Sequence, residues 1–446
     1  MVGGDENDLI SVVRGSLGGR SEEFKAFGAD FFSNNLYALL MHVYAALLGN
    51  NPTISTAELS ALLPDFTQKH LIANQYCIFE TKEELNQDTL NRLGGTIIIA
   101  KQVTGNAVLT FADIPSLLAT ELSTVKGKVV FSLRLVGIPP REGKDLFRAC
   151  KNGLKKKGVP SRYTGNEREA AKPIVLHDDG LLDPKKGCEL TIIREKHLFW
   201  IGRTVAAQNV KAYTLRDIGK PVRDTTVGLL PPKLAQILLN FGEYLANENA
   251  KKTLKSYVVF DPFCGTGVIP IEVLLRRNTI LASDVSLKAV NGCEKNIEWT
   301  RKTYKILKKD AESIVWKQDA TKPFDLKKHV PDIIVTEGSL GPALSDRPTI
   351  KDIEKFMRDS DDLAAGFLKN CKACLPNVPI VMTLPVWYAM KKMMPLKKIA
   401  ETIDACGYKT VMPPHVSGWL PDRLSLLYRR SDQFVGREIV LLMPKK

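Results

Sequence analysis

Residues 258–267, Val-Val-Phe-Asp-Pro-Phe-Cys-Gly-Thr-Gly, constrain the fold more than any other part of the chain. The pattern predicts a strand, a tight glycine turn and the start of a helix. Such a turn lets backbone N–H groups and a helix N-terminus approach a ligand closely. The spacing is not Gly-x-Gly-x-x-Gly and no Gly-Lys-Ser/Thr follows. The segment therefore favours neither a dinucleotide site nor a P-loop.

From Tyr257 onward, apolar strands alternate with helices, which is typical of a doubly wound parallel sheet. The segments that carry this alternation are residues 258–260, 269–275, 279–283, 289–305, 333–336, 361–374 and 380–384. Residues 424–430 and 437–443 predict an antiparallel hairpin that closes the sheet. Pro232 suits the first position of a helix that runs over residues 233–245.

The N-terminal half predicts two smaller α+β units behind a loose, glycine-punctuated tail over residues 1–35. In the first unit, residues 36–48 are either a buried strand or a short helix, because periodicity alone does not decide. Ser55 and Glu58 have the spacing of a capping box, which places a helix start at Ser55. The unit's other expected elements are strands over residues 76–79 and 96–103 and a helix over residues 82–91.

The second unit, residues 112–210, combines strands with one strongly amphipathic helix. The helix is expected over residues 144–157, with three lysines at its C-terminus, where cations suit the helix dipole. The strands are expected over residues 129–138, 174–176, 189–194 and 197–204, the last two as a hairpin. Residues 211–232 predict a linker to the C-terminal domain.

Length and composition exclude several classes of protein. At about 100–200 residues per domain, 446 residues suggest two to four domains. A composition of 44% apolar and 25% charged residues excludes a mostly disordered, collagen-like or coiled-coil chain. The longest apolar run, residues 36–48, is shorter than the about 20 residues of a membrane span. Eight cysteines do not make a disulfide framework, so we expect a cytoplasmic protein.

The positive charge is unevenly placed along the chain. The net charge is +14, and residues 121–233 hold 23 Lys and Arg against 12 Asp and Glu. A basic domain beside a near-neutral one indicates a polyanionic partner, most simply a nucleic acid. The alternative is an ordinary solvated face.

Two acids follow later strands of the predicted sheet. Asp284 comes 17 residues after Gly267, at the end of the next strand. An acid in this place can accept hydrogen bonds from ribose hydroxyls. Asp319 follows the short apolar run 314–316 and could reach an adenine edge.

Residues 261–267, Asp-Pro-Phe-Cys-Gly-Thr-Gly, resemble motif I of S-adenosylmethionine-dependent amino-methyltransferases. The resemblance extends to residues 93–95, 223–236 and 428–439, which are similar to the THUMP-containing tRNA guanosine-N2 methyltransferase family. That archaeal and eukaryotic family methylates the guanosine at tRNA position ten. The likeness implies a ferredoxin-like domain (36–111), a THUMP-like RNA-binding domain (112–210), a linker (211–232) and a Rossmann-like methyltransferase domain (233–446).

The resemblance also implies a cofactor, a substrate and site residues. S-adenosylmethionine would be the cofactor, with its methionine end at the motif I loop, its ribose at Asp284 and its adenine at Asp319. tRNA would be the partner, and some relatives also need a small activator subunit; no membrane is implied. The cofactor-binding candidates are Asp261, Phe263, Gly265, Gly267, Asp284 and Asp319. Cys264, in the same loop, is interpreted as a packing residue.

The chain departs from the family at its catalytic motif, Asp-Pro-Pro-Tyr with Asn and Phe variants. The aligned residues are Glu337, Gly338, Ser339 and Leu340. Glu337 could still accept an N–H of the target amine, but the aromatic residue that stacks on the base is absent. Trp387 or Tyr388 could replace it. The chain is thus either an active enzyme with an altered motif or a tRNA-binding relative without catalysis. A THUMP-like domain argues against a third reading, a DNA amino-methyltransferase.

The basic residues divide into two groups of RNA-binding candidates. Each could instead belong to a solvated face, and Arg223 could pair with Asp224. The candidates are Lys155, Lys156, Lys157 and Arg162 in the THUMP-like unit, and Arg216, Lys220 and Arg223 in the linker. A zinc site is not indicated, because Cys371 and Cys374 have no second ligand pair nearby.

Overall fold

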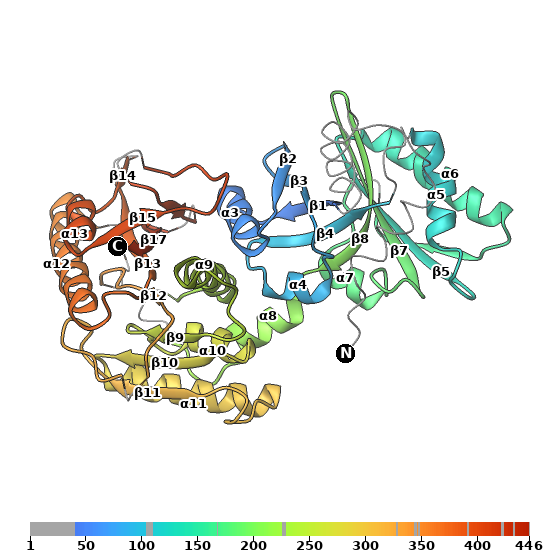
Figure 1. Ribbon diagram of the computed structural model, residues 1–446. Coiled ribbons are helices and arrows are strands. Elements are labelled where there is room, and N and C mark those ends of the chain that lie inside the picture. Colours follow the sequence, from blue (N-terminus) through green and yellow to red (C-terminus); the bar gives the residue numbers. More distant parts are fainter. Residues whose placement is uncertain are drawn as a thin grey trace, which may run out of the picture. The chain divides into compact units, whose positions relative to one another are not determined.

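Two sheets organise the chain in the computed structural model (Figure 1). The structure describes residues 41–103, 110–166, 168–224, 229–326, 329–342, 346, 348–389, 392–420, 423–430 and 433–445. The predicted tail over residues 1–35 lies outside this range. No helix in the described ranges is both long enough and apolar enough to cross a membrane.

The C-terminal sheet has the strand order β11-β10-β9-β12-β13-β17-β15. The strands from β11 to β13 are parallel, and β17 runs antiparallel to β13, β15 and β16. The elements are α9 (Pro232–Ala250), β9 (Val258–Asp261), α10 (Val268–Leu275), β10 (Thr279–Asp284), α11 (Leu287–Tyr304), β11 (Ser313–Lys317), β12 (Ile333–Glu337), α12 (Ile350–Cys374), β13 (Ile380–Ala389), β14 (Lys392–Met394), α13 (Ile399–Ala405), β15 (Tyr408–Val411), β16 (Leu426–Tyr428) and β17 (Val435–Pro444). This is the Rossmann-like α/β fold that the sequence predicts, with the closing antiparallel strands and with Pro232 at the start of α9.

Both faces of this sheet are covered, as its apolar strands require. Neighbouring residues of a strand point to opposite faces. Val259 and Val335 pack in one apolar cluster with α9 and α10, whereas Phe260 and Ile334 pack in the other with α12. The two clusters fix the strands so that their carboxyl ends lie together at one edge.

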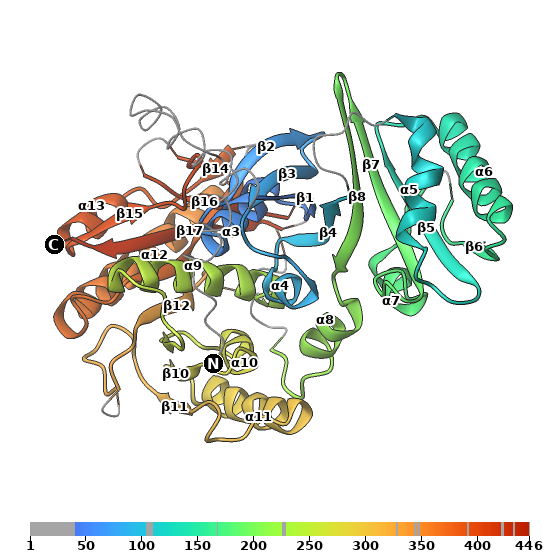
Figure 2. The ribbon, with the colours of Figure 1, turned by 45° about the vertical axis from the view of Figure 1, so that its right-hand side comes forward.

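The N-terminal sheet has the order β2-β3-β1-β4-β8-β7-β5-β6. Its elements are β1 (His42–Leu48), α3 (Pro52–Leu62), β2 (Thr67–Ile72), β3 (Tyr76–Thr81), α4 (Gln87–Arg92), β4 (Thr96–Gln102), the short helix η1 (Phe111–Asp113), α5 (Ile114–Glu121), β5 (Val129–Val136), α6 (Pro140–Lys156), β6 (Ser161–Tyr163), α7 (Pro173–Asp178), β7 (Gly187–Glu195), β8 (Leu198–Ala207) and α8 (Val210–Asp217). Figure 2 shows α5 and α6 beside β5 and β7, and their apolar residues share one cluster with these strands. β4 pairs with β8, so strands from both predicted α+β units belong to one sheet.

Three expectations for the N-terminal half are wrong in detail. The run over residues 174–176 is helical within α7, which begins at Pro173, a residue well suited to a helix start. The helix expected over residues 82–91 begins only at Gln87, because the Asn86 side chain caps it by accepting hydrogen bonds from the backbone of Asp88 and Thr89.

The third correction concerns the capping box. α3 begins at Pro52 rather than after Ser55, and the Ser55 hydroxyl donates to the backbone oxygen of Asn51. Glu58 is fully buried and does not cap the helix. Its carboxylate accepts hydrogen bonds from the backbone N–H groups of Gly94 (2.9 Å) and Gly95 (2.8 Å) instead.

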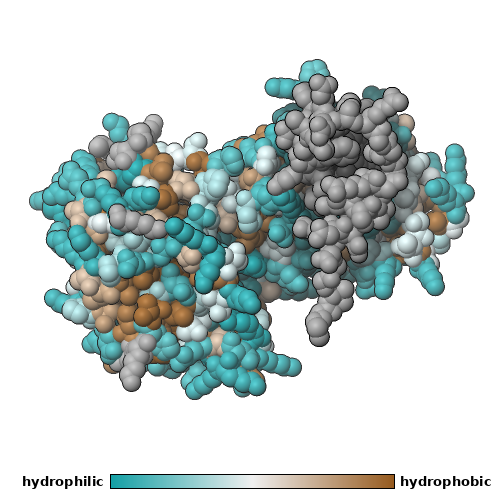
Figure 3. All heavy atoms as spheres, viewed as in Figure 1, coloured by the Kyte–Doolittle hydropathy of each residue, from teal (hydrophilic) through white to brown (hydrophobic). Residues whose placement is uncertain are grey.

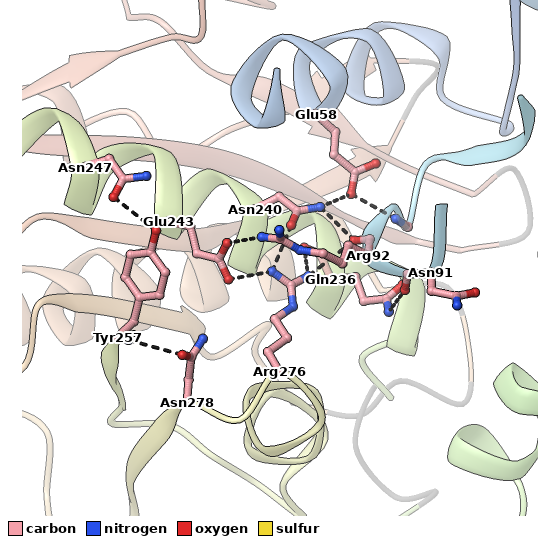
Figure 4. Close-up of polar contacts among 11 residues, drawn as sticks. Glu58, Asn91, Arg92, Gln236, Asn240, Glu243, Asn247, Tyr257, Arg276 and Asn278 are labelled. Atoms are coloured by element: carbon pink, nitrogen blue, oxygen red, sulfur yellow. Dashed lines mark hydrogen bonds and ion pairs between the residues drawn. The ribbon is translucent and has the colours of Figure 1, made fainter. Parts of the chain in front are cut away.

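Glu58 belongs to a polar network that ties α3 and the glycines before β4 to helix α9 of the Rossmann-like domain (Figure 4). The Asn240 amide of α9 donates to Glu58 over 2.7 Å. Arg276, the residue that follows α10, donates to the Asn240 side chain and pairs with Glu243, which also pairs with Arg92. Burial raises the pKa of Glu58 to about 7, although its three hydrogen bonds act in the opposite direction.

We expect Glu58→Ala to lower the free energy of unfolding by about 3 kcal/mol or more. Three buried donors lose their acceptor, and each unsatisfied buried donor costs about 1–3 kcal/mol. Urea unfolding followed by circular dichroism measures the change. The control is Glu248→Ala on exposed α9 surface, which removes the same group without a buried partner. Equal stability of the two variants would show that the network is not a structural tie.

Candidate functional site

A cavity of about 620 Å³ lies at the carboxyl ends of β9, β10 and β12. The strand order changes direction between β9 and β12, and crevices at such switch points are where open α/β sheets bind ligands. Of the residues singled out in the sequence, those lining the cavity are Asp261, Phe263, Gly265, Asp284, Asp319, Glu337, Gly338, Ser339 and Leu340. The structure thus brings together the predicted cofactor and catalytic residues, apart from Gly267.

The two motif I glycines have different reasons to be glycine. Gly265 has φ +51°, and no atom beyond its two chain neighbours lies within 4 Å of the position that a Cβ would take. Gly267 has φ +88°, and a Cβ there would lie 2.7 Å from the Cys293 sulfur of α11. Gly265 therefore leaves space at the cavity, whereas Gly267 allows α10 and α11 to pack closely. Cys264 is buried beside Cys293, as expected for a packing residue.

Asp284 fixes the glycine turn against the end of β10. One carboxylate oxygen accepts from the Gly265 N–H over 3.0 Å, and the other accepts from the Ser286 N–H over 2.9 Å. Asp319 accepts from the N–H and the hydroxyl of Thr321, and these hydrogen bonds lower its pKa. Both acids line the cavity, and each already accepts hydrogen bonds from backbone N–H groups with part of its carboxylate.

Asp261 ends β9 and is only 1% exposed. It accepts hydrogen bonds from the Thr336 hydroxyl (2.6 Å) and the Phe263 N–H (3.2 Å). Burial raises the pKa of Asp261 to about 7, and the negative charges of Asp284 and Glu337 add to the shift. The carboxyl groups of Asp261, Asp284 and Glu337 thus lie close together. Their negative charges require a cation nearby to balance them.

Arg437 of β17 supplies that balance at Glu337. Its Nε lies 2.5 Å from Glu337 Oε1, and the Arg437 side chain is 2% exposed. Burial raises the pKa of Glu337, and the guanidinium opposes the shift. Arg437 Nη2 also donates to the backbone oxygen of Leu229 over 3.4 Å. Sequence reasoning missed Arg437; the available signal was a charged Arg-Glu pair inside an otherwise apolar strand.

The residues after Glu337 continue along the cavity wall. A Cβ on Gly338 would lie 2.8 Å from the backbone oxygen of Thr383, so the chain passes close to β13. Trp387 is fully buried and so does not offer a ring for stacking on a base, which corrects the expectation for this residue. Tyr388 instead packs under the guanidinium of Arg429, 4.0 Å from the ring centroid.

Apolar side chains line part of the same cavity. Phe263, Leu340 and Leu363 contribute, and Val285 is 64% exposed at its edge. Figure 3 shows hydrophobic residues gathered on the visible face of the Rossmann-like domain, in the region where Figure 1 draws β12. Carboxylates beside apolar walls suit a ligand with both polar groups and flat rings.

Two of the RNA-binding candidates are buried, which corrects their prediction. Arg216 pairs with Glu272 of α10 over 2.9 Å, with side chains 11% and 2% exposed. Lys220 is 4% exposed, and burial lowers its pKa. Arg216 is not available to RNA phosphates, because it is paired with the buried carboxylate of Glu272. Lys220 is not available either, because the surrounding protein buries its side chain.

The other candidates lie on the surface. Lys155, Lys156 and Lys157 are exposed at the end of α6, and Arg223 is exposed as well. Arg162 is half exposed and pairs with Asp179 over 2.7 Å. Asp224, which could pair with Arg223, forms an ion pair with Lys288 over 3.0 Å. In the described ranges, no group of three or more His, Cys, Asp and Glu could hold a metal ion.

No family model and no curated protein matches this chain. TrmN from Thermus thermophilus is 14% identical, with a TM-score of 0.47, over 91% of this chain and 99% of that chain. A possible methylase from Clostridium difficile 630 is 10% identical, with a TM-score of 0.45, over 91% and 99%. The putative methyltransferase SMU.472, complexed with SAH, is 9% identical, with a TM-score of 0.41, over 91% and 99%. These sequence identities and TM-scores are too low to assign an activity to this chain. The assignment of the fold is based on the chain's own strand order.

Proposed function

We propose that this chain is an S-adenosylmethionine-dependent tRNA methyltransferase that forms N2-methylguanosine. The observation that carries the proposal is the cavity at the switch point, where Asp261, Gly265 and Asp284 lie together with Glu337. Asp261 and Gly265 belong to the motif I segment that carries the resemblance, whereas Glu337 stands where the chain departs from the family's catalytic motif. In this proposal the chain is divided into a ferredoxin-like domain, a THUMP-like domain over residues 112–210, a linker and the Rossmann-like domain.

The residues of the cavity fit S-adenosylmethionine. The open space at Gly265 lets a ligand reach the backbone of the turn, and Asp261 can accept hydrogen bonds from an ammonium group. Asp284 and Asp319 offer acceptors for ribose hydroxyls and an adenine amine. A volume of about 620 Å³ is in the range of small-molecule sites. When bound, the cofactor supplies a methyl group on a positively charged sulfur.

Glu337 is the residue proposed to orient the guanine amine. Its Oε1 pairs with Arg437, and its Oε2 has no hydrogen bond to the part of the chain that the structure describes. Oε2 can therefore accept an N–H of the exocyclic amine and direct the nitrogen lone pair toward the methyl group. Positioning of this kind supplies much of the rate of a group transfer. Arg437 favours the ionised carboxylate, which is the form that accepts.

The exposed lysines at the end of α6 are proposed to hold the tRNA. Lys155, Lys156 and Lys157 follow one another at the helix C-terminus, where the helix dipole favours cations. Phosphate contacts from such residues position RNA without reading its sequence. A guanine inside a duplex must also be extruded before it can enter a cavity.

The test is methyl transfer from labelled S-adenosylmethionine to unmodified tRNA, followed by nucleoside analysis. We expect N2-methylguanosine from the wild type and none from Asp261→Ala. Transfer to another nucleoside, or to duplex DNA in a parallel reaction, would overturn the assigned substrate. Tight binding of tRNA and cofactor without transfer would favour the non-catalytic alternative or a missing activator subunit.

We expect cofactor affinity to fall as the pH is lowered through about 7. Asp261 has a pKa of about 7, so below that pH its carboxyl group becomes protonated and cannot accept from an ammonium group. Each pH unit below the pKa leaves about tenfold less carboxylate, and the dissociation constant rises in proportion. Calorimetric titration between pH 5.5 and 8 measures it. Asp261→Asn should bind weakly with a flat profile, and a flat wild-type profile would remove Asp261 from the ammonium site.

A further inference from the structure

A second cavity, of about 710 Å³, lies beside the first. Its wall combines the loop after β1, the glycines that precede β4, helix α8, the start of α9 and the end of β16. The residues that matter for its chemistry are Lys233, Arg429, Arg430, Asp217 and Tyr213. The cavity thus gathers three cations and one carboxylate from segments far apart in the sequence.

The cations lack carboxylate partners in the described part of the chain. Lys233 donates to the neutral Gln208 side chain over 2.7 Å and lies 5.1 Å from the Tyr213 ring centroid. Arg430 donates to the Tyr428 hydroxyl over 3.3 Å. Among described residues none of the three cations forms an ion pair, and the buried Nε of Arg429 has no hydrogen-bond partner. The guanidinium of Arg429 lies over the Tyr388 ring.

Lys233 and Arg430 also repel one another. Desolvation lowers the pKa of Lys233, and the positive charge of Arg430 lowers it further. Like charges held close together, with neutral partners, are stabilised when an anion binds between them. α9 begins at Pro232 on the same wall, and a helix N-terminus adds partial positive charge.

The two cavities are joined by the segment that precedes α9. Leu229 and Leu230 line the first cavity, and the next residues, Pro231 and Pro232, line the second. Arg437 reinforces the junction, because it binds Glu337 and the Leu229 oxygen and lies 5.9 Å from the Tyr428 ring. Consecutive residues of one short segment therefore line both cavities, which places the second cavity next to a base held in the first.

We infer that the second cavity binds backbone phosphates of the RNA strand next to the nucleotide held at Glu337, through Lys233, Arg429 and Arg430. The inference rests on the proposed function and adds a contact that orients the strand. Guanidinium and ammonium groups without carboxylate partners are the donors that phosphates prefer. A strand anchored next to the target nucleotide also steadies an extruded base.

The experiment compares Arg429→Gln/Arg430→Gln with the wild type in binding an unmodified tRNA transcript at several salt concentrations. We expect the dissociation constant to rise about tenfold to a hundredfold. Since each lost phosphate contact removes about 0.7–0.9 from the slope of log affinity against log salt, the slope should fall by about 1–2. Lys302→Gln/Lys309→Gln is the matched control, because it removes two exposed cations that line neither cavity. Lys233→Gln gives an independent variant if the double variant does not fold.

Binding of S-adenosylmethionine, measured by calorimetry, separates the possible failures. The inference requires this affinity to stay at the wild-type value in every variant while tRNA affinity falls. If the double variant binds tRNA with the same affinity and the same salt dependence as the control variant, the second cavity is not an RNA site. The proposed function would not be affected by that result. A wild type that binds the cofactor but not tRNA would overturn both. The wild type could also bind inorganic phosphate, with the double variant losing this binding but keeping its tRNA affinity. That result would overturn the RNA site and indicate a site for a free anion.

Discussion

Glu337→Gln is expected to lower kcat for methyl transfer at least about a hundredfold while the dissociation constant of the cofactor stays within about twofold. The substitution keeps the shape of the side chain but replaces a carboxylate by an amide, which accepts less strongly from the guanine amine. Cofactor affinity is spared because Asp261, Gly265 and Asp284 carry the proposed cofactor contacts. Single-turnover transfer at saturating tRNA and cofactor measures the effect. Glu354→Gln, on exposed α12 surface, is the control.

Arg437 provides a second way to examine the same pair. Arg437→Gln leaves Glu337 in place but removes the cation that opposes the rise of its pKa. The carboxylate then forms only at higher pH, so the activity profile of this variant should move to higher pH than that of the wild type. Unchanged kcat in Glu337→Gln, or an unmoved profile in Arg437→Gln, would show that Glu337 does not receive the amine.

Gly267→Ala is expected to lower the free energy of unfolding by about 3 kcal/mol, and Gly265→Ala by about 1 kcal/mol. Both glycines have positive φ, which costs an L-residue about 1–2 kcal/mol. Gly267→Ala also forces a Cβ to within 2.7 Å of the Cys293 sulfur, and overpacking adds about 1–3 kcal/mol. For cofactor affinity we expect the opposite order, with the larger loss in Gly265→Ala, because the added methyl group would occupy space in the cavity.

Urea unfolding and calorimetric titration of the cofactor distinguish the two glycines. Each variant serves as the control for the other, since both add one methyl group within the same turn. Equal losses of stability would mean that the packing of α10 on α11 does not depend on Gly267. Wild-type cofactor affinity in Gly265→Ala would place the ligand away from the turn.

The Rossmann-like sheet was predictable because its signals are local. Each strand from β9 to β13 is a short apolar run, and the glycine turn and the acid after β10 lie within about 25 residues of one another. These signals need no knowledge of distant contacts. The cavity followed from them, because the carboxyl ends of parallel strands must meet at one edge.

The residues that were missed depend on distant partners. The groups that donate to Glu58 lie 36, 37 and 182 residues away in the sequence. Its spacing from Ser55 reveals none of them and instead predicts a helix cap that does not form. Arg437 lies 100 residues from Glu337. Arg216 was expected on the surface from its place in a linker, but Glu272, an acid inside the apolar helix α10, required a buried cation.

The pairing of β4 with β8 has a consequence for any attempt to divide the chain. The sequence suggests a border near residue 111, yet the strand that covers the edge of β4 comes from residues 198–207. A fragment that stops at the border would present an uncovered strand edge, which is a template for aggregation. Grafts and truncations therefore have to carry residues 42–207 as one piece.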